Sequence, residues 1–371
     1  MKILWLSWKD ISHPAAGGAE RILHQLSTAL VADGHEVTVL TAAYPGAQEH
    51  EAIDGVHIIR AGNNRYTHSF VALWRYVRKF RNKFDLVIEV VNTAPYFSLF
   101  FRDRAKRALF YHQLAREVWF HEAPAPLSHI GHYVLEPVAT FLLGARRAPT
   151  ITISESTKQD LRKFGFRDEA IKIIREAITL EPLPSLYNSR KFDHPTILSH
   201  GSIRAMKRTL DQVKAFEMAK LRIPNLQLKI SGDATGDYGR RVLNYIENSP
   251  FSDDIQYMGR VTDAQKQQLM RSSHILTVTS IKEGWGLIVT EAASQGTPAV
   301  VYDVDGLRDS VRNGVTGKVT APTPRKMADG IIEVFSDMPS YHRMRRAAWE
   351  WSQELTPDSS YKDFVTALEI A

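Results

Sequence analysis

The chain has 371 residues, too many for one ordinary hydrophobic core, and this length suits two domains. Its hydrophobic content of 44% and charged content of 24% are typical of a globular protein and exclude a long disordered region. Because it contains no cysteine, disulfides and thiolate metal sites are excluded, and we expect a reducing compartment, the cytoplasm.

Strands and helices are expected to alternate through the first half. We predict strands at Lys2–Leu6, Glu36–Thr41, Val56–Arg60, Asp85–Val90, Ala108–His112 and Thr150–Ile153. We predict helices at Gly18–Ala32, Ser69–Arg81, Pro95–Phe101, His129–Ala145 and Ser156–Phe164, the last with Ser154 as N-cap. Strands separated by helices form right-handed βαβ units, so we expect a doubly wound parallel sheet.

The segment 75–107 is rich in basic residues. Nine are basic (Arg75, Arg78, Lys79, Arg81, Lys83, Arg102, Arg104, Lys106 and Arg107) and three are acidic (Asp85, Glu89 and Asp103). This excess of six equals the net charge of the whole chain, and eight aromatic residues are interleaved with it from Trp74 to Phe101. Two interpretations stand side by side: a surface that rests on anionic lipid headgroups, or two ordinary helices with solvated basic faces. No nucleic-acid motif accompanies the charge, so a nucleic-acid partner is not expected.

The most apolar longer stretch is Tyr133 to Ala145. It is interrupted by Glu136 and Pro137 and is too short to cross a bilayer. We therefore exclude a transmembrane enzyme.

A proline-rich polar linker, Ile178 to Pro195, separates the two halves. Beyond it we predict strands at Thr196–His200, Gln227–Ser231, Ile255–Met258, Ile275–Val278 and Ala299–Tyr302. Helices are predicted at Lys207–Lys220, Tyr238–Asn248, Asp263–Arg271 and Gly286–Ser294. We expect domains at 1–180 and 181–352, and a helix at 353–371 that packs back on the first domain. We expect Trp349 and Trp351 to pack between the domains.

The most informative stretch is Ser280 to Gly296, SIKEGWGLIVTEAASQG. A buried strand, a glycine-bearing turn and a helix N-terminus together form a site for anions, with the amides of Gly284, Trp285, Gly286 and Leu287 available. Carboxylates repel phosphate, so Glu283 and Glu291 are expected to accept hydrogen bonds from sugar and ribose hydroxyls. One turn could thus hold a sugar nucleotide.

The same stretch, continued as EGWGLIVTEAASQGTPAVV, resembles the E-x7-E signature of the family-4 retaining glycosyltransferases, which have the GT-B fold. The resemblance implies two Rossmann-like domains facing across a cleft and a C-terminal helix that returns to the first domain. It also implies that Glu291 holds the nucleotide ribose, while Glu283 and the amides that follow it contact the donor sugar and its phosphates.

Two elements of the first half fit this resemblance. GGAE, with Gly17 and Gly18, looks like the family's glycine-rich loop, whose backbone approaches the donor phosphate or the acceptor. YHQLAREVW resembles the H-x-L-(A/G)-(R/K) element, in which the histidine, here His112, lies beside the donor sugar. In such enzymes the leaving phosphate is argued to deprotonate the acceptor, so His112 would position the sugar and would not act as a general base.

The second half carries the family's cationic element with one departure. Lys207 is in register for the phosphate-binding lysine, but Ser202 stands where the family has arginine. We expect Arg204, in preference to Arg208, to supply the missing guanidinium for the leaving diphosphate. Gly259 and Arg260 resemble the segment near the nucleobase. Gly306 stands in the place of the family's loop near the donor sugar.

Asp303-Val304-Asp305 spells the D-x-D metal motif of another glycosyltransferase fold. We reject this interpretation, because the motif comes late in the second domain and no other cluster has metal-ligand spacing. We therefore expect neither a metal nor a cofactor, with the nucleotide sugar as co-substrate.

The sequence thus predicts a retaining hexosyltransferase. It would move a sugar from a UDP- or GDP-sugar to an acceptor hydroxyl of a carbohydrate or lipid-linked acceptor, in cell-surface glycan or glycolipid biosynthesis. We expect it in the cytoplasm, with peripheral attachment to the inner face of the cell membrane as the first interpretation of segment 75–107. Two alternatives remain open: a GT-B sugar-nucleotide epimerase, and a protein that binds a nucleotide sugar without turnover.

Overall fold

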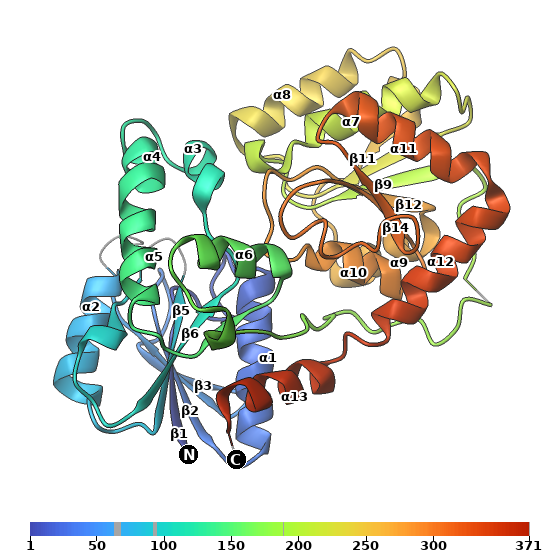
Figure 1. Cartoon of the computed structure of the whole chain (residues 1–371). Coiled ribbons are helices and arrows are strands. Elements are labelled where there is room, and N and C mark those ends of the chain that lie inside the picture. Colours follow the sequence, from blue (N-terminus) through green and yellow to red (C-terminus); the bar gives the residue numbers. More distant parts are fainter. Residues whose placement is uncertain (63–67, 92–94, 188, 371) are drawn as a thin grey trace. The chain divides into compact units, whose positions relative to one another are not determined.

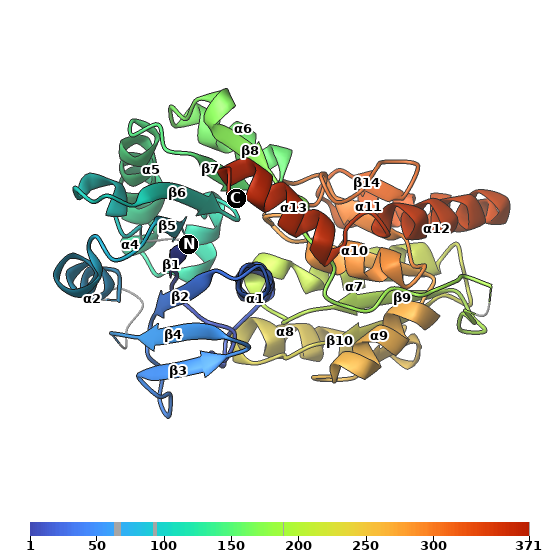
Figure 2. The same ribbon diagram turned by 90° about the horizontal axis from the view of Figure 1, so that it is seen from below.

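A computed structural model describes residues 1–62, 68–91, 95–187 and 189–370. It consists of two compact units (Figures 1 and 2). The first comprises Met1–Ala177 together with the C-terminal segment from Thr356, and the second is Ile178–Leu355. The sequence-based boundaries lie at 180/181 and 352/353, and residue 371, the last of the expected C-terminal segment, is outside the described residues.

The first unit is built on an eight-stranded sheet of order β3-β4-β2-β1-β5-β6-β7-β8. The strands are β1 (Lys2–Leu6), β2 (Glu36–Thr41), β3 (His50–Ile53), β4 (Val56–Arg60), β5 (Leu86–Val91), β6 (Lys106–Tyr111), β7 (Thr150–Thr152) and β8 (Ile171–Ile173). All pairs are parallel except β3 with β4, so the expected parallel sheet is confirmed with one antiparallel edge. The two edge strands β3 and β8 were not predicted. Each is short and contains exposed residues, so neither shows the apolar run that indicates a buried strand.

The helices of the first unit are more broken than predicted. They are α1 (Gly18–Ala32), α2 (His68–Arg75), η1 (Tyr76–Phe80), η2 (Ser98–Phe100), η3 (Arg116–Val118), α3 (Trp119–Glu122), α4 (Leu127–Ile130), η4 (Gly131–Leu135), α5 (Glu136–Gly144), α6 (Glu155–Lys163), η5 (Asp168–Ala170) and α13 (Pro357–Leu368). The two long predicted helices each contain a π-helical turn, η1 and η4. The expected N-cap is confirmed, since Ser154 Oγ accepts a hydrogen bond from the Thr157 amide at 3.2 Å.

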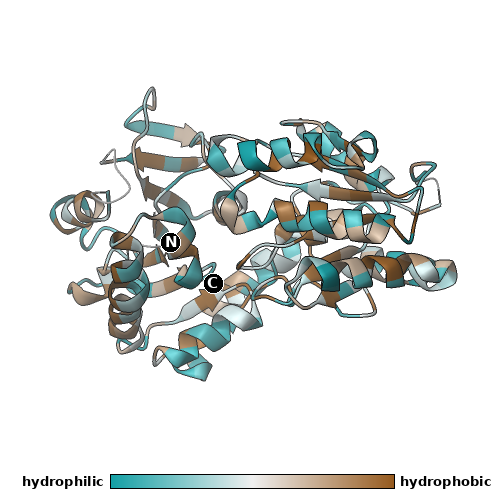
Figure 3. Ribbon diagram, turned by 90° about the horizontal axis from the view of Figure 1, so that it is seen from above, coloured by the Kyte–Doolittle hydropathy of each residue, from teal (hydrophilic) through white to brown (hydrophobic). Residues whose placement is uncertain are grey.

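The second unit has a six-stranded parallel sheet of order β11-β10-β9-β12-β13-β14. Its strands are β9 (Thr196–His200), β10 (Gln227–Ser231), β11 (Ile255–Tyr257), β12 (Ile275–Val278), β13 (Ala299–Tyr302) and β14 (Gly317–Thr320). Its helices are η6 (Ala205–Lys207), α7 (Thr209–Lys220), α8 (Gly236–Glu247), η7 (Ser252–Asp254), α9 (Asp263–Ser272), α10 (Leu287–Ser294), α11 (Pro324–Ser336) and α12 (Met338–Ser352). Strands in both units are mainly hydrophobic (Figure 3), as parallel strands covered on both faces require.

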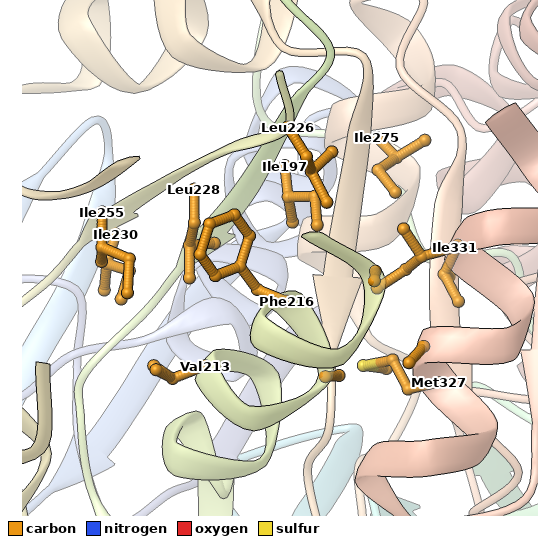
Figure 4. Packing of buried hydrophobic residues seen from close by; sticks show 14 of the residues in the cluster. Ile197, Val213, Phe216, Leu226, Leu228, Ile230, Ile255, Ile275, Met327 and Ile331 are labelled. Atoms are coloured by element: carbon orange, nitrogen blue, oxygen red, sulfur yellow. The ribbon is translucent and has the colours of Figure 1, made fainter. Parts of the chain in front are cut away.

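The core of the second unit lies between its sheet and helices α7 and α11 (Figure 4). Phe216 of α7 packs among sheet residues such as Leu228 and Ile230, and Met327 and Ile331 of α11 extend the same cluster. This core fixes the strand ends, and with them the loops that carry the predicted site residues.

The last helix, α13, packs on the first unit. Phe364 stacks on Trp5 of β1 with ring centroids 5.5 Å apart, and Asp363 pairs with Arg175 at 2.7 Å. The tryptophans of α12 contact the second unit instead: Trp349 donates to the Leu183 carbonyl at 2.9 Å, and Trp351 packs near Trp285. The expectation that these two tryptophans pack between domains is therefore wrong for the contacts described.

Candidate donor site and the loops of the first unit

The turn between β12 and α10 depends on Gly286. This residue is the N-cap of α10 with φ +98°, and a Cβ there would lie 2.9 Å from Leu307 Cδ2. A side chain would be both strained and crowded, so glycine is required. The turn presents the first amides of α10, beginning at Leu287, which have no carbonyl partner within the helix. The Trp285 ring packs 6.1 Å from the Trp351 ring in the hydrophobic core, so this residue contributes its backbone to the turn.

Glu283 and Lys207 form an ion pair just before this turn. Lys207 Nζ contacts Glu283 Oε1, which also accepts a hydrogen bond from Ser280 Oγ at 2.6 Å. Burial raises the pKa of the Glu283 carboxyl, but the charge and hydrogen bond of Lys207, the Ser280 hydroxyl and the nearby charge of Arg204 outweigh it and hold this pKa below its usual range. Glu283 is therefore an ionised hydrogen-bond acceptor at neutral pH.

Gly306 lies directly against the backbone of Glu283. With φ +79°, a Cβ at Gly306 would come within 2.3 Å of the Glu283 carbonyl oxygen, and the Glu283 amide donates to the Asp305 carbonyl at 3.0 Å. The loop after β13 thus supports the turn before α10. The resemblance predicts that Gly306 lies near the donor sugar, and the structure places it against the backbone of Glu283 and Gly284.

The carboxylates of the D-x-D sequence are engaged by cations. Asp303 pairs with Arg308 at 2.7 Å, and Asp305 pairs with both Lys282 and Arg308. Across the described ranges, no group of three or more histidine, aspartate or glutamate side chains is arranged to hold a metal ion. Metal independence stays a prediction.

Glu291 lies in a polar contact of its own on α10. Its side chain is only 4% exposed, with Oε2 2.7 Å from Lys266 Nζ on α9 and Oε1 2.7 Å from Thr179 Oγ1. A carboxylate has about four lone-pair sites, so about two are left by these contacts, and the contact with a ribose stays a prediction. Neither Lys266 nor Thr179 was predicted, because one lies on another helix, the other lies in the linker, and nothing in their local sequence marks them.

The loops after β9, β10 and β11 are joined through their backbones. A Cβ at Gly232 would come 1.9 Å from the Gly201 carbonyl oxygen, the Gly232 amide donates to Gly259 at 2.8 Å, and the Ile203 amide donates to Asp233 at 2.7 Å. These contacts bring together the loops that carry Ser202, Arg204, Gly259 and Arg260.

The side chains of these loops differ in their exposure and in their partners. Ser202 is exposed, and Arg260 is a largely exposed partner of Asp233 at 3.1 Å, an ion pair of small energetic weight. Arg204 adds positive charge near Glu283, whereas Arg208 has φ +49° at the start of α7 and places its charge near Tyr302 and Tyr238. The charge of Arg204 thus acts on Glu283 together with that of Lys207, and the choice of Arg204 over Arg208 for the diphosphate stays a prediction.

In the first unit, Glu20 interacts with both Gly17 and His112. The Gly17 amide donates to Glu20 Oε2 at 2.6 Å, a contact that caps α1 just before Gly18, and Lys9 pairs with Glu20 at 3.2 Å. His112 follows β6, and burial lowers its pKa to about 4, although the Glu20 charge opposes the shift. Its buried Nε2 has no hydrogen-bond partner among the residues described. His112 is therefore a neutral imidazole with one ring nitrogen to offer.

Arg116, four residues beyond His112, is held within the first unit. Glu136 accepts hydrogen bonds from the Arg116 amide at 2.8 Å and from the Ala115 amide at 2.5 Å, and the Arg116 guanidinium donates to the His132 carbonyl at 3.0 Å. Arg116 thus orders the loop after His112.

Two family models match consecutive parts of the chain. Residues 16–181 match the model described as "Glycosyltransferase Family 4", and residues 188–351 match "Glycosyl transferases group 1", the part that carries both signature glutamates. The chain belongs to the group 1 glycosyltransferases.

Curated relatives of this glycosyltransferase are distant in sequence, and they cover the whole chain or a part of it. Glycogen synthase of Mycobacterium tuberculosis is 24% identical over 394 residues, covering 99% of this chain and 93% of the relative. D-inositol 3-phosphate glycosyltransferase of Paenarthrobacter aurescens is 27% identical over 183 residues, covering 46% of this chain and 45% of the relative.

Solved structures show that this glycosyltransferase has the GT-B fold. Sucrose-phosphate synthase from Thermosynechococcus elongatus has a TM-score of 0.77 at 18% identity, covering 99% of this chain and 98% of that one. HepE from Anabaena, solved in complex with UDP and glucose, has a TM-score of 0.73 at 17% identity, with 100% of both chains covered. The expected fold class is thereby confirmed.

Proposed function

We propose that this glycosyltransferase moves a hexose from a UDP- or GDP-sugar to an acceptor hydroxyl with retention of the anomeric configuration and without a metal ion. The observation that carries the proposal is the pairing of Lys207 with Glu283 immediately before the Gly286 turn and helix α10. Here the loop after β9 supplies a cation, and the turn before α10 supplies an ionised carboxylate and a helix N-terminus, as a sugar linked to a diphosphate requires.

Each predicted residue has a role in this proposal. Lys207 and Arg204 stabilise the charge that develops on the leaving diphosphate, and the amides of Gly284 to Leu287 bind its oxygens. Glu283 accepts hydrogen bonds from the donor sugar, supported by Gly306. Glu291 accepts hydrogen bonds from the ribose with its remaining lone pairs. Ser202, Gly259 and Arg260 lie along the nucleotide.

The first unit would supply the acceptor side. His112 is neutral, so its ring can donate or accept one hydrogen bond to position the sugar, while the leaving phosphate takes the acceptor proton. The Gly17–Gly18 loop brings the backbone close to the start of α1, where the Gly17 amide is bonded to Glu20. HepE, which shares the fold, was solved with UDP and glucose, and this supports a UDP-sugar as the first donor to test.

The acceptor we propose is a carbohydrate or lipid-linked glycan of the cell surface, modified in the cytoplasm at the membrane. The basic segment 75–107 was one reason for this idea. In the structure Arg75 pairs with Glu49 at 2.7 Å and Arg107 contacts Tyr76 at 3.2 Å, whereas Lys79, Arg81 and Arg104 are exposed. No helix in the described part of the chain is long and apolar enough to cross a membrane. The epimerase and the non-catalytic binding protein are not favoured by the family matches.

Thermal unfolding with nucleotides tests the donor site. A ligand at a hundred times its dissociation constant adds roughly 2.7 kcal/mol to the stability of the protein that binds it. We expect UDP or GDP, and the matching nucleotide sugars, to stabilise the wild type, and Glu291→Gln to lose most of this increment. Thr179→Val is the matched control, because it removes one hydrogen bond to Glu291 and leaves the carboxylate.

The readout is the shift caused by ligand within each variant, so that a general loss of stability does not count as lost binding. Transfer of radiolabelled sugar to a membrane glycolipid fraction, with the anomeric configuration determined by NMR, then tests the reaction. Stabilisation of Glu291→Gln equal to that of wild type, or an inverted product, would overturn the assignment.

A further inference from the structure

The segment 127–144 of the first unit exposes an unusual number of large apolar side chains (α4 and α5, Figure 1). We call the following seven residues the apolar face: Ile130, Tyr133, Val134, Leu135, Val138, Phe141 and Leu142, with 41% to 66% of each residue exposed. They recur at intervals of one or three residues and form the exposed side of this helical segment. No exposed residue between 130 and 145 in this described stretch carries a charge.

Three polar residues of the same segment face the protein. His132, Glu136 and Thr140 recur every fourth residue and are 8%, 7% and 3% exposed. Glu136 binds the amides of Ala115 and Arg116, and the His132 carbonyl accepts from Arg116. The segment is thus inverted relative to an ordinary surface helix, with polar residues inward and apolar residues outward. Such a surface in water marks an interaction site.

Cations and aromatic rings border the apolar face where α5 ends. The Arg146 guanidinium lies 4.1 Å from the Phe100 ring centroid, which places segment 100–104 beside the end of α5. Phe100 and Phe101 are 38% and 36% exposed, and Arg102, Arg104 and Arg146 are all exposed. Because β6 and β7 run parallel, the residues just before them lie at the same edge of the sheet. One end of the apolar face therefore has a cationic, aromatic border.

We propose that the apolar face is an interfacial surface that sits in the headgroup region of an anionic lipid bilayer. Apolar and aromatic side chains enter the acyl boundary, while the arginines bind anionic headgroups. Lipid is preferred to a second copy of the chain because the border and the chain's net charge of +6 are both positive, which favours an anionic partner over a like-charged one. The apolar face at 130–142 lies outside segment 75–107, which contributes Phe100, Phe101, Arg102 and Arg104 to the border.

The inference also specifies the acceptor, and in this respect it rests on the proposed function. Glu136 and His132 hold the loop at Ala115 and Arg116, which follows His112 in the chain. The segment that meets the lipid therefore also orders the loop after His112, the residue predicted to lie beside the donor sugar. A substrate presented there would be a glycan whose lipid remains in the bilayer.

Vesicle binding tests the surface without any assumption about catalysis. The probes are vesicles of phosphatidylcholine alone and of phosphatidylcholine with about 30% phosphatidylglycerol, an anionic lipid, sedimented with the purified full-length chain and no nucleotide. Val134→Gln/Val138→Gln/Phe141→Gln keeps good helix formers on the segment and removes its apolar character. Arg102→Gln/Arg104→Gln/Arg146→Gln removes the cationic border. Leu221→Gln/Arg222→Gln, at exposed positions of the second unit, is the matched control.

We expect the wild type and the control to bind anionic vesicles and both test variants to bind at least about tenfold more weakly, since each arginine near the surface contributes on the order of a fivefold change. Added salt should weaken the wild type and leave the arginine variant little changed. Absent wild-type binding, or equal binding by the apolar-face variant, overturns the inference. So does a concentration-dependent dimer, by light scattering, that the apolar-face variant abolishes while vesicles bind neither protein. Nucleotide stabilisation in the same preparations separates these failures from a failure of the proposed function.

Discussion

Among the described residues, the ion pair between Lys207 and Glu283 is the contact on which the proposed chemistry most depends. Their ion pair is partly exposed, at 26% and 17% for the two side chains, so a ligand can reach it. The pair has two possible purposes: Lys207 holds Glu283 in place, or Lys207 also neutralises a leaving diphosphate. If Lys207 only holds Glu283 in place, removal of its charge lowers activity and stability together. If it also neutralises the diphosphate, removal of its charge lowers turnover more than it lowers stability.

Lys207→Met separates these purposes because it keeps the side-chain stem and removes the charge. We expect turnover to fall by about 10²- to 10³-fold, as for the loss of one transition-state electrostatic contact. Steady-state transfer assays with the identified donor measure it. Lys220→Met is the control, since Lys220 is a buried partner of Asp254 at 2.7 Å, at the C-terminal end of α7 and outside the predicted site. If both variants lose the same activity in proportion to their stability, Lys207 has only a structural role.

At the scale of elements, helix α13 is separated from the rest of its unit in sequence by the whole second unit. Its contacts are nevertheless those of a core element: Phe364 is fully buried against Trp5, Asp363 makes a two-pronged pair with Arg175, and Tyr361 donates to Asp33 at 2.6 Å. The first unit is therefore incomplete without the end of the chain.

Phe364→Ala should destabilise the first unit by about 3–5 kcal/mol, the usual cost of removing a buried aromatic side chain. We expect the unfolding transition of that unit to move to lower temperature in calorimetry, while nucleotide-dependent stabilisation of the second unit remains. Phe216→Ala is the reciprocal variant, because Phe216 is equally buried in the other core. A Phe364 variant that shifts only the nucleotide-sensitive transition would contradict the assignment of α13 to the first unit.

At the scale of the whole molecule, several buried histidines make stability depend on pH. Burial lowers the pKa of His112, His200 and His274 to about 4. Since histidine in the unfolded chain titrates near its ordinary pKa of about 6.5, the unfolded chain binds more protons than the folded chain between that pH and about pH 4. Stability is therefore full above this window and is lost as the pH falls through it. Burial of Glu89 and Glu136 raises their pKa values, which acts in the opposite direction.

His200→Gln isolates one of these contributions. His200 bonds to Ser231 Oγ at 2.8 Å and is outside the predicted set of site residues. We expect the loss of unfolding free energy between about pH 7 and pH 5 to be smaller in the variant by about 1–2 kcal/mol. Urea denaturation at the two pH values measures this difference. An unchanged pH dependence would mean that His200 is not buried as a neutral imidazole.

Much of this protein is determined locally and could be predicted from its sequence. The β9, β10, β12 and β13 strands have the predicted bounds, and α1 begins at Gly18 as expected. Ser154 caps α6 because a hydroxyl two or three residues before free amides needs no distant partner. The Glu283 to Glu291 spacing and the Gly286 turn lie within a single strand, turn and helix, which explains why they identify the family.

Other features depended on contacts between distant parts of the chain. Lys266 and Thr179 reach Glu291 from another helix and from the linker, and Arg204 is grouped with Glu283 only by the packing of the loops after β9 and β12. The sequence could not predict that the apolar side of segment 127–144 faces outward. Periodicity shows that the two faces of a helix differ in polarity, but it does not show which face packs on the core. Burial of Glu136 against the amides of Ala115 and Arg116 decides that question, and it turns the apolar face outward. Sequence determined most of the elements and the signature, since these follow from short-range chemistry. Tertiary structure alone decided which charges meet and which apolar surface remains uncovered.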